Sequence, residues 1–398
     1  MRSIIGSILL AAFTIPVVTA LQAPSAAARG SIHTLVIESQ HLSESREILV
    51  RTPQGYESSE SHYPVLIVLD ADWHFSLAAA DVEFLAECSY LGRHLIPEMI
   101  VVGIANGDRN FDFTPTRREE QIGMRFPTSG GAQPFRSFLI EEVLPRVDQE
   151  FRTHPYRVLA GWSLGGLFAT DSWCEAKPGF DAFLAISPSL WWDDQLLLRR
   201  FREREGPLPA GQLVITLGSE EQDTHVSRSV DAWTVHLDSV AGPDLAPALV
   251  PIDGFGHNYS PKMAFFSGLL TLFDDWIVPR ETVASGLGAV DDYYAKLSSR
   301  YHFAIPVPED VYGQIGWGLF ESGDVEGSSV VFRTWLQRAP GSALAHASLG
   351  AFCRETGQSD EATELLREAI RLEELSGSPR SGFVSDLRRE VAALEADN

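Results

Sequence analysis

The sequence predicts an α/β fold in which helices cover both faces of a mostly parallel sheet, followed by a small region made only of helices. Extended apolar runs alternate with helical patterns from Ile32 to Ile277, which is typical of parallel sheets. After Pro279 only helical patterns remain, and they repeat with a period of 34 residues. The 398 residues have room for one domain of about 250 residues and a smaller one, so we expect the first domain to span 30–280.

The expected strands are short apolar runs bounded by polar segments. The first two, 32–40 and 46–52, are predicted to form a β-hairpin. The later runs are of the fully buried type and lie at 65–69, 99–104, 156–160, 182–186, 213–217 and 248–252. Helices are expected between them at 78–91, 134–151, 195–204 and 226–240, with a long polar loop before residue 134. Open sheets of this kind bind ligands at the carboxyl ends of their strands.

The helical region contains an internal repeat. Small and apolar residues recur 34 positions apart: Gly316 and Gly350, Gly323 and Gly357, Ser328 and Ala362, Phe332 and Leu366, and Leu336 and Ile370. This spacing is that of tetratricopeptide repeats. We expect a linker over 281–308, two tetratricopeptide-like repeats over 309–374 and a closing helix over 375–398. Two repeats are too few to stand alone, so they need the closing helix or the first domain as packing partner. Four ordinary antiparallel helices are the alternative.

The N-terminus has the pattern of a secretory signal peptide. Arg2 precedes an apolar stretch from Ile4 to Ala20, which ends in the small-residue sequence Val18-Thr19-Ala20. The stretch is short for a membrane span, which takes about 20 apolar residues. An uncleaved anchor is the alternative. We expect residues 1–20 to be removed and the mature chain, without a membrane span, to be periplasmic or secreted.

Composition limits the partners of the chain. The net charge of −23 argues against nucleic acid and anionic membrane surfaces, because these bind clustered Lys and Arg. Solubility is the simplest role of the acidity. The three cysteines, Cys88, Cys174 and Cys353, form no disulfide framework and are expected to be buried thiols. No His and Cys cluster has zinc-site spacing, and no phosphate loop with its Lys follows a strand, so neither a metal nor an organic cofactor is expected.

The hexapeptide from Gly161 to Gly166, Gly-Trp-Ser-Leu-Gly-Gly, lies between an expected strand and an expected helix. A G-x-S-x-G turn in this position forces its serine into a strained backbone conformation and exposes the hydroxyl above the sheet. The flanking glycines leave room for neighbouring backbone. Because the pattern also arises by chance, it depends on partners elsewhere in the chain. Ser163 is the candidate nucleophile.

A serine hydroxyl needs a general base, and the base needs a third group that orients it. His257 lies in a Gly-rich loop after the last expected strand, and it follows the serine, as the chain order Ser, acid, His requires. The acid should lie between them, after the strand 213–217, where the sequence offers three carboxylates. We choose Glu221, with Glu220 and Asp223 as the alternatives.

The developing negative oxygen of an acyl transfer needs two backbone N–H donors. Leu164, directly after the serine, is expected to supply one. The other is expected in the loop after the strand 65–69, from Asp72 or Trp73. A Gly-rich loop of the lipase type is absent there, and a place in the core is the alternative for Trp73.

Four segments together resemble the putative-esterase family of α/β-hydrolases. They are the serine elbow, the loop from Leu69 to Phe75, the string from Ile104 to Arg109 that leads to Thr114-Pro115-Thr116, and Ile186-Ser187-Pro188-Ser189-Leu190-Trp191-Trp192. That family includes esterase D, feruloyl esterases, mycolyltransferases and ferric-siderophore esterases. The siderophore-esterase-like members, some of which carry tetratricopeptide repeats behind the hydrolase domain, are the most similar in pattern. The resemblance covers about residues 31–279 and implies the α/β-hydrolase fold, with Ser163 as nucleophile, His257 as base and Glu221 as acid.

The sequence departs from the family pattern beside the candidate site. Trp162 replaces the His that is common before the serine, and Ala71 replaces the Gly that is common in the Leu-Asp-Gly-Asp loop. Phe111 stands where a basic residue is frequent, which leaves Arg109 as the nearer cation for an anionic ferric siderophore. These changes bear on the substrate more than on the reaction.

We expect an exported serine hydrolase that cleaves small-molecule carboxylic esters through an acyl-enzyme. Arg109 and four tryptophans are candidates for substrate binding: Trp73, Trp162, Trp191 and Trp192. For the tryptophans, packing in the core is the alternative. An acyltransferase with the same triad is one alternative function. The other is an interaction protein whose repeats bind a protein partner and whose hydrolase domain is an inactive scaffold.

Overall fold

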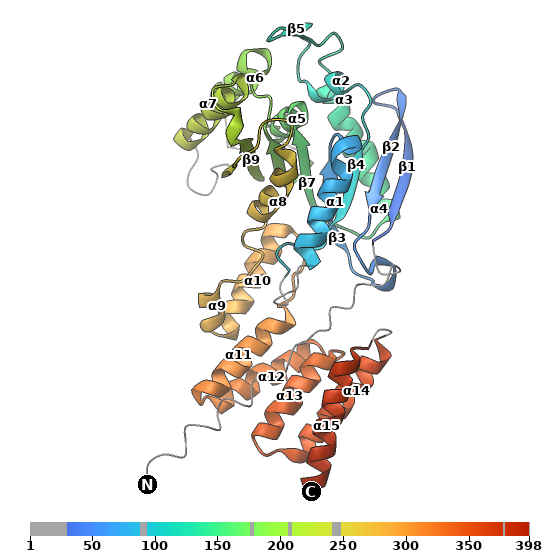
Figure 1. Cartoon of the computed structure of the whole chain (residues 1–398), viewed down its shortest axis with the longest axis vertical. Coiled ribbons are helices and arrows are strands. Elements are labelled where there is room, and N and C mark those ends of the chain that lie inside the picture. Colours follow the sequence, from blue (N-terminus) through green and yellow to red (C-terminus); the bar gives the residue numbers. More distant parts are fainter. Residues whose placement is uncertain are drawn as a thin grey trace.

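The computed structural model describes residues 30–87, 94–175, 179–205, 209–240, 248–376 and 379–397. An α/β domain lies at one end of the elongated molecule and a bundle of helices at the other (Figure 1). The expected signal peptide at 1–20 and Cys88 lie outside the described residues. Within these ranges, no helix is both long and apolar enough for a bilayer span.

Eight strands form one sheet in the order β1-β2-β4-β3-β7-β8-β9-β10. Neighbouring strands are parallel from β4 to β10, whereas β2 runs antiparallel to both β1 and β4. The sheet is therefore mixed and mostly parallel, which confirms the predicted fold class. The strands are β1 (Ile32–Ser39), β2 (Glu44–Arg51), β3 (Tyr63–Val68), β4 (Ile100–Ile104), β7 (Thr153–Trp162), β8 (Ala182–Ile186), β9 (Gln212–Gly218) and β10 (Ala248–Ile252).

Alternate residues of each central strand enter different cores. In β3, Leu66 and Val68 pack in the cluster that holds α1 (Ala71–Glu87) and α8 (Pro261–Leu272). Val65 and Ile67 pack in the cluster on the other face, under helices 132–150, 164–173, 192–202 and 225–240. Because both faces are covered, the strands have to be apolar at every position, which explains the continuous runs in the sequence.

The helices of the α/β domain follow the predicted order with different bounds. Helix α1 begins at Ala71 rather than at residue 78, because Asp70, with φ of 54°, turns the chain directly from β3 into the helix. The predicted helix 134–151 is a continuous series of three segments. The remaining elements are η2 (Tyr56–Ser58), α2 (Arg109–Phe113), α3 (Ala132–Ser137), the π-helical η3 (Phe138–Val143), α4 (Leu144–Glu150), α5 (Leu164–Trp173), α6 (Trp192–Arg202), η4 (Ser219–Glu221) and α7 (His225–Val240).

The predicted polar loop before residue 134 contains structure of its own. Helix α2 lies in it, as does a small hairpin of β5 (Glu120–Gln121) and β6 (Met124–Arg125). The two residues of its turn, Ile122 and Gly123, both have positive φ, which is the geometry of tight hairpin turns. The hairpin projects from the end of the molecule opposite the helical bundle (Figure 1).

The helical region consists of α9 (Arg280–Ala284), α10 (Leu287–Tyr301), α11 (Glu309–Ser322), α12 (Val325–Arg338), α13 (Ala343–Glu355), α14 (Ser359–Leu375) and α15 (Ser381–Asp397). The 34-residue period has a structural basis, because α13 and α14 begin 34 positions after α11 and α12. A Cβ on Gly316 would lie 2.6 Å from the Phe332 ring, and one on Gly350 would lie 3.0 Å from Leu366. The repeated glycines therefore let the helices of each pair approach closely, while the tetratricopeptide assignment stays a prediction.

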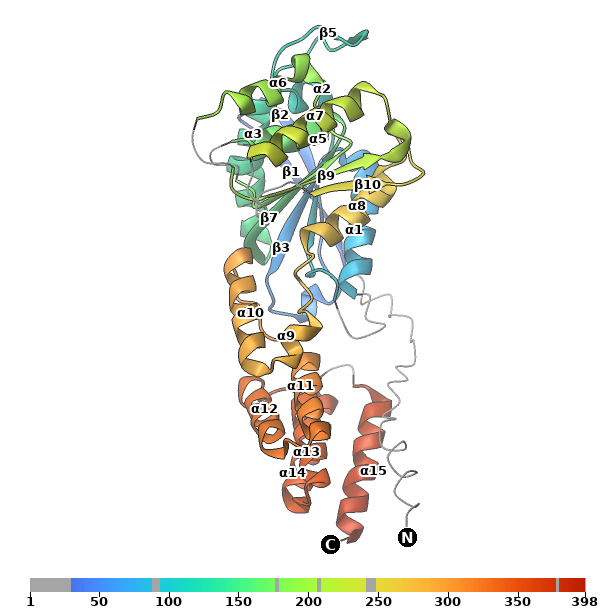
Figure 2. The same ribbon diagram turned by 90° about the vertical axis from the view of Figure 1, so that its left-hand side faces the viewer.

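The helical region packs on the end of the sheet where the parallel strands begin (Figure 2). Tyr301 of α10 is fully buried, with its ring centroid 4.8 Å from that of Tyr156 in β7 and 5.6 Å from that of Phe273. Its hydroxyl donates to Asp275 Oδ1 at 2.7 Å. One apolar cluster continues from the sheet through this contact into α15.

Candidate active site

Ser163 lies at the turn between β7 and α5. Its φ of 58° and ψ of −113° are a strained combination for a residue with a side chain, as the elbow pattern predicts. A Cβ on Gly161 would lie 2.4 Å from the carbonyl oxygen of Gly165, so only glycine fits there. The turn therefore depends on this close approach of two backbone segments, and it leaves Ser163 half-buried at the carboxyl end of the sheet.

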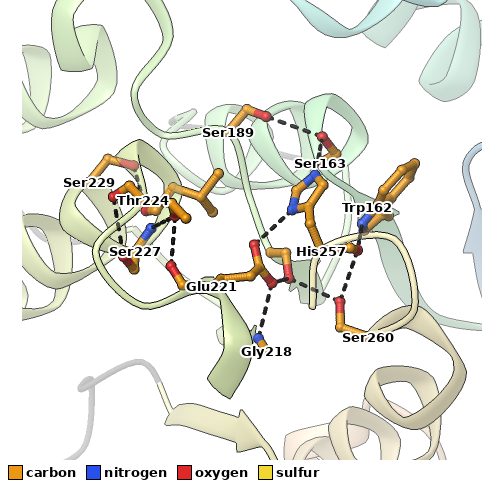
Figure 3. Close-up of polar contacts among 12 residues, drawn as sticks. Trp162, Ser163, Ser189, Gly218, Glu221, Thr224, Ser227, Ser229, His257 and Ser260 are labelled. Atoms are coloured by element: carbon orange, nitrogen blue, oxygen red, sulfur yellow. Dashed lines mark hydrogen bonds and ion pairs between the residues drawn. The ribbon is translucent and has the colours of Figure 1, made fainter. Parts of the chain in front are cut away.

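Three predicted residues from separate loops form one series of hydrogen bonds (Figure 3). The Ser163 Oγ lies 3.0 Å from His257 Nε2, and His257 Nδ1 lies 2.7 Å from Glu221 Oε2. An ionised carboxylate only accepts hydrogen bonds, so His257 carries its proton on Nδ1 and accepts the Ser163 hydroxyl at Nε2. This geometry suits the transfer of the serine proton to the imidazole.

Of the three candidate carboxylates, Glu221 is the one that reaches His257. It closes the short turn η4 after β9 and is 2% exposed, whereas Glu220 and Asp223 point into solvent. Burial alone would raise the pKa of Glu221, but hydrogen bonds from His257 and Ser187 bring that pKa below its usual value. The carboxylate is therefore ionised at neutral pH and able to stabilise a protonated imidazole.

The two predicted oxyanion donors lie at the starts of two helices. Leu164 is the first residue of α5, so its N–H has no acceptor within the helix. In α1 the Trp73 N–H donates to the Asp70 carbonyl oxygen at 2.9 Å, which removes Trp73 from the candidates. The Asp72 N–H has no acceptor among the residues that the structure describes, and Asp72 Oδ2 accepts from Asn106 N–H at 2.9 Å. Leu164 and Asp72 therefore remain the predicted pair.

Arg109 connects the two halves of this donor pair. Its Nε donates to Asp70 Oδ1 at 2.8 Å, and its Nη2 donates to the carbonyl oxygen of Trp162 at 3.2 Å. Asp70 is fully buried, and burial raises its pKa against the opposing charge of Arg109. The guanidinium is therefore committed to the elbow and to the start of α1, rather than free to bind a substrate as the sequence had suggested.

The four candidate tryptophans have different surroundings. Trp192 is fully buried in the core and donates to Thr116 Oγ1, so its prediction as a substrate contact is wrong. Trp191 is half-buried, with its ring 5.4 Å from that of His225. Trp73 is 59% exposed and meets the half-buried Trp162 edge to face, so neither is a deep core residue. Trp162 directly precedes the serine, and its Nε1 donates to the His257 carbonyl oxygen at 2.9 Å.

Sequence reasoning missed three serines around the series. Ser189 Oγ lies 3.3 Å from Ser163 Oγ, and Ser189 N–H donates to the Ser163 carbonyl oxygen at 3.0 Å. Ser187 contacts Glu221, and Ser260 contacts Ser187. The signal that identifies two of them is the Ser-Pro-Ser string after β8, which was used only as a mark of resemblance. In the described ranges, no three His, Cys, Asp or Glu side chains are grouped as metal ligands.

The family model with the description Putative esterase matches residues 39–238, about half of the chain. Among curated proteins, the chain is 30% identical over 155 residues to ferri-bacillibactin esterase BesA of Bacillus subtilis, covering 35% of this chain and 52% of that protein. It is 37% identical over 130 residues to siderophore enterobactin esterase of Emericella nidulans, covering 29% of this chain and 42% of that protein. The chain thus spans about half the length of these relatives.

Solved structures extend the likeness over more of the chain. An IroE-like serine hydrolase from Shewanella oneidensis has a TM-score of 0.65 at 25% identity, covering 77% of this chain and 99% of that chain. An uncharacterised protein from Capnocytophaga ochracea has a TM-score of 0.65 at 14% identity, covering 92% of this chain and 100% of that chain. The second likeness concerns the fold alone, and it includes most of the helical region. With its α/β-hydrolase fold and its matched residues 39–238, the chain belongs to the Putative esterase family.

Proposed function

We propose that the chain hydrolyses carboxylic esters through an acyl-enzyme formed on Ser163. The observation that carries this proposal is the unbroken series of hydrogen bonds from the Ser163 hydroxyl through His257 to the buried Glu221. The strained turn at Ser163 and membership of an esterase family support it. An inactive scaffold has no reason to hold these three groups in productive geometry.

The geometry supports a two-step reaction. Ser163 Oγ attacks the ester carbonyl carbon while its proton passes to His257 Nε2, and Glu221 stabilises the imidazolium. The N–H groups of Leu164 and Asp72 stabilise the negative oxygen of the tetrahedral intermediate. His257 then gives the proton to the leaving alkoxide, and the acyl group stays on Ser163. In the second step His257 takes a proton from a water molecule while the water oxygen attacks the acyl carbon. The second tetrahedral intermediate then releases the acid, and His257 returns the proton to Ser163 Oγ.

Labelling with a fluorophosphonate probe tests the reaction class. The full chain should be labelled on a serine, and Ser163→Ala should abolish the labelling. As a matched control, Ser189→Ala keeps the nucleophile and should still be labelled. Labelling that survives Ser163→Ala would rule out the assigned nucleophile, and a wild-type chain that does not react would favour the inactive scaffold.

We propose a siderophore ester as the substrate. The support is that BesA and the Emericella enzyme are named for ferri-bacillibactin and enterobactin. The half-buried Trp162 next to Ser163, together with the exposed Trp73 against its ring, offers ring faces and edges to an aromatic acyl group. A panel of a triscatecholate lactone, a feruloyl ester and a short acyl ester tests this. The lactone should exceed the short ester in kcat/KM by about 10-fold or more. Acyl transfer to an added alcohol in preference to water would indicate the acyltransferase instead.

Two further proposals concern the rest of the chain. The apolar stretch and small-residue site within residues 1–20 support export, and N-terminal sequencing of the protein from the host's periplasm or medium tests it. The 34-residue period of the helical region supports a tetratricopeptide-like unit that binds a protein partner.

A further inference from the structure

Two buried serines form a series of contacts that begins at Oε1 of Glu221, the carboxylate oxygen that does not meet the His257 ring. Ser187 directly follows β8, Ser260 directly precedes α8, and both are fully buried. Ser187 Oγ is 2.6 Å from Glu221 Oε1 and 3.1 Å from Ser260 Oγ. Ser260 Oγ is in turn 3.2 Å from the carbonyl oxygen of His257 (Figure 3). The two hydroxyls therefore join the acid to the main chain of the base by a second route.

The direction of each hydrogen bond follows from the charge of Glu221. Because the carboxylate accepts only, Ser187 O–H donates to Oε1, and the Gly218 N–H donates to the same oxygen at 3.1 Å. The Ser187 oxygen is then free to accept, so the one Ser260 proton has two acceptors within reach, that oxygen at 3.1 Å and the His257 carbonyl oxygen at 3.2 Å. Both hydroxyls are out of reach of solvent, so bulk water does not replace either of them.

Ser187 has an unusual backbone conformation. Its φ of 41° lies in the left-handed region, which a serine rarely adopts. Its N–H donates to the Thr216 carbonyl oxygen of the adjacent strand β9 at 2.8 Å, which fixes this conformation. The conformation aims the hydroxyl at Glu221.

We infer that Ser187 and Ser260 are positioning residues for the proposed triad. Ser187 holds Glu221 ionised and in the orientation that meets His257, and Ser260 ties the Ser187 hydroxyl to the His257 main chain. This inference rests on the proposed function, because it assigns the acid and the base their roles. Among the described residues, the titratable group that faces Glu221 from another loop is His257, while Glu220 and Asp223 on its own turn are exposed.

Removal of the Ser187 hydroxyl has an expected sign. Ser187→Ala takes away a donor to the carboxylate, so the pKa of Glu221 rises and the carboxyl is protonated at a higher pH. The acidic limb of the kcat/KM profile for p-nitrophenyl butyrate reports the coupled pair of His257 and Glu221. It should move to higher pH by about half a unit or more, because the pair holds its proton more tightly without the Ser187 donor. At neutral pH, kcat/KM should fall by about 10- to 100-fold.

Ser260→Ala gives a smaller expected loss, because it acts on Glu221 only through Ser187. We expect about a 3- to 10-fold fall in kcat/KM, and the double variant should lose less than the product of the two single losses. The matched control is Ser229→Ala on α7. Ser229 is also buried and hydrogen-bonded, to the Val226 carbonyl oxygen at 2.8 Å, and it does not contact the triad. Its kinetics should stay those of the wild type.

A second readout needs no turnover. The Nδ1–H proton of His257, identified by its absence in Glu221→Gln, should give a downfield NMR signal that vanishes with acid. In Ser187→Ala the signal should vanish at a higher pH than in the wild type, whereas a merely structural role would leave this pH unchanged. If the wild type cleaves no ester but Ser187→Ala still shifts the pH at which the signal vanishes, the proposed function is overturned, while the role of Ser187 in positioning Glu221 against His257 is supported. Signals and profiles of both variants that match Ser229→Ala would overturn the inference. If Ser187→Ala does not fold, Ser260→Ala decides in the same two assays.

Discussion

Glu221 differs from its neighbours in what surrounds the carboxylate. His257, Ser187 and Gly218 all donate to it, whereas Glu220 and Asp223 stand in solvent. Glu221→Gln keeps the shape but loses the charge that orients and stabilises the imidazolium, so kcat should fall by about 1,000- to 10,000-fold. Steady-state assays with p-nitrophenyl butyrate measure this. Glu220→Gln and Asp223→Asn should stay within about twofold of the wild type, and a large loss in either would show that the acid is misassigned.

His74 makes the stability of the protein depend on pH. It is buried against Trp162 and Phe265, and burial, then the charge of Arg109, lowers its pKa from 6.5 to about 4. Between these values the unfolded chain binds a proton that the folded protein does not, so stability is lost as the pH falls from about 6.5 towards 4, by at most about 3 kcal/mol. Urea unfolding at several pH values checks this. His74→Phe should flatten that part of the curve, and an equal slope in both proteins would contradict the assignment.

Sequence reasoning at the residue scale selected Ser163 and His257, which the structure brings together, and chose Glu221 as the acid with two other carboxylates as alternatives. Ser163 and His257 are marked by glycines and by chain order, which are visible in the sequence. The choice among Glu220, Glu221 and Asp223 depends on how the turn η4 rotates each side chain, and that rotation is set by contacts from β8 and the His257 loop. Ser187 is visible in the Ser-Pro-Ser string, but the string does not show that this serine contacts Glu221. That contact depends on the register of β8 against β9.

The elbow is the element on which the site depends. A Cβ at Gly161 would lie 2.4 Å from the Gly165 carbonyl oxygen, whereas a Cβ at Gly165 would meet nothing nearer than 3.5 Å. Gly161→Ala should therefore force the backbone apart and lower the free energy of unfolding by about 1–3 kcal/mol, with loss of activity. Gly165→Ala should change the free energy of unfolding by less than about 1 kcal/mol. Urea denaturation of both variants makes the comparison, and equal losses would contradict it.

The sequence predicted the positions of helices and strands where the apolar pattern is strong. It failed where tertiary contacts decide the placement of a residue or a short element. Continuous apolar runs identified the central strands, because both faces of the sheet are covered. The pattern could not separate a core tryptophan from one in a pocket wall, so Trp192 was misplaced. Its neighbour Asp193 has left-handed φ and binds Arg118 and Thr116, which turns the chain and drives the Trp192 ring inward. The β5–β6 hairpin was missed because four residues carry too little periodicity.

At the scale of the whole molecule, the helical region and the sheet share one apolar core. Tyr301 sits at the junction, buried between Tyr156 and Phe273, at the end of β7 opposite Ser163. Tyr301→Ala should lower the free energy of unfolding by about 3–5 kcal/mol, while activity per folded molecule stays unchanged. The exposed Val330 is the control, and Val330→Ala should cost less than about 0.5 kcal/mol. The wild type should unfold in one transition, monitored by both fluorescence and circular dichroism, and two separate transitions would contradict the shared core.

The backbone of Ser163 carries a cost that only its reactivity justifies. With φ of 58° and ψ of −113°, the serine occupies a conformation that disfavours any side chain by about 1–3 kcal/mol. Ser163→Gly should relieve this and give a protein that melts at a higher temperature but does not react with fluorophosphonate. The proposed nucleophile would then hold a conformation that lowers thermal stability in return for reactivity, and selection for stability alone would remove it.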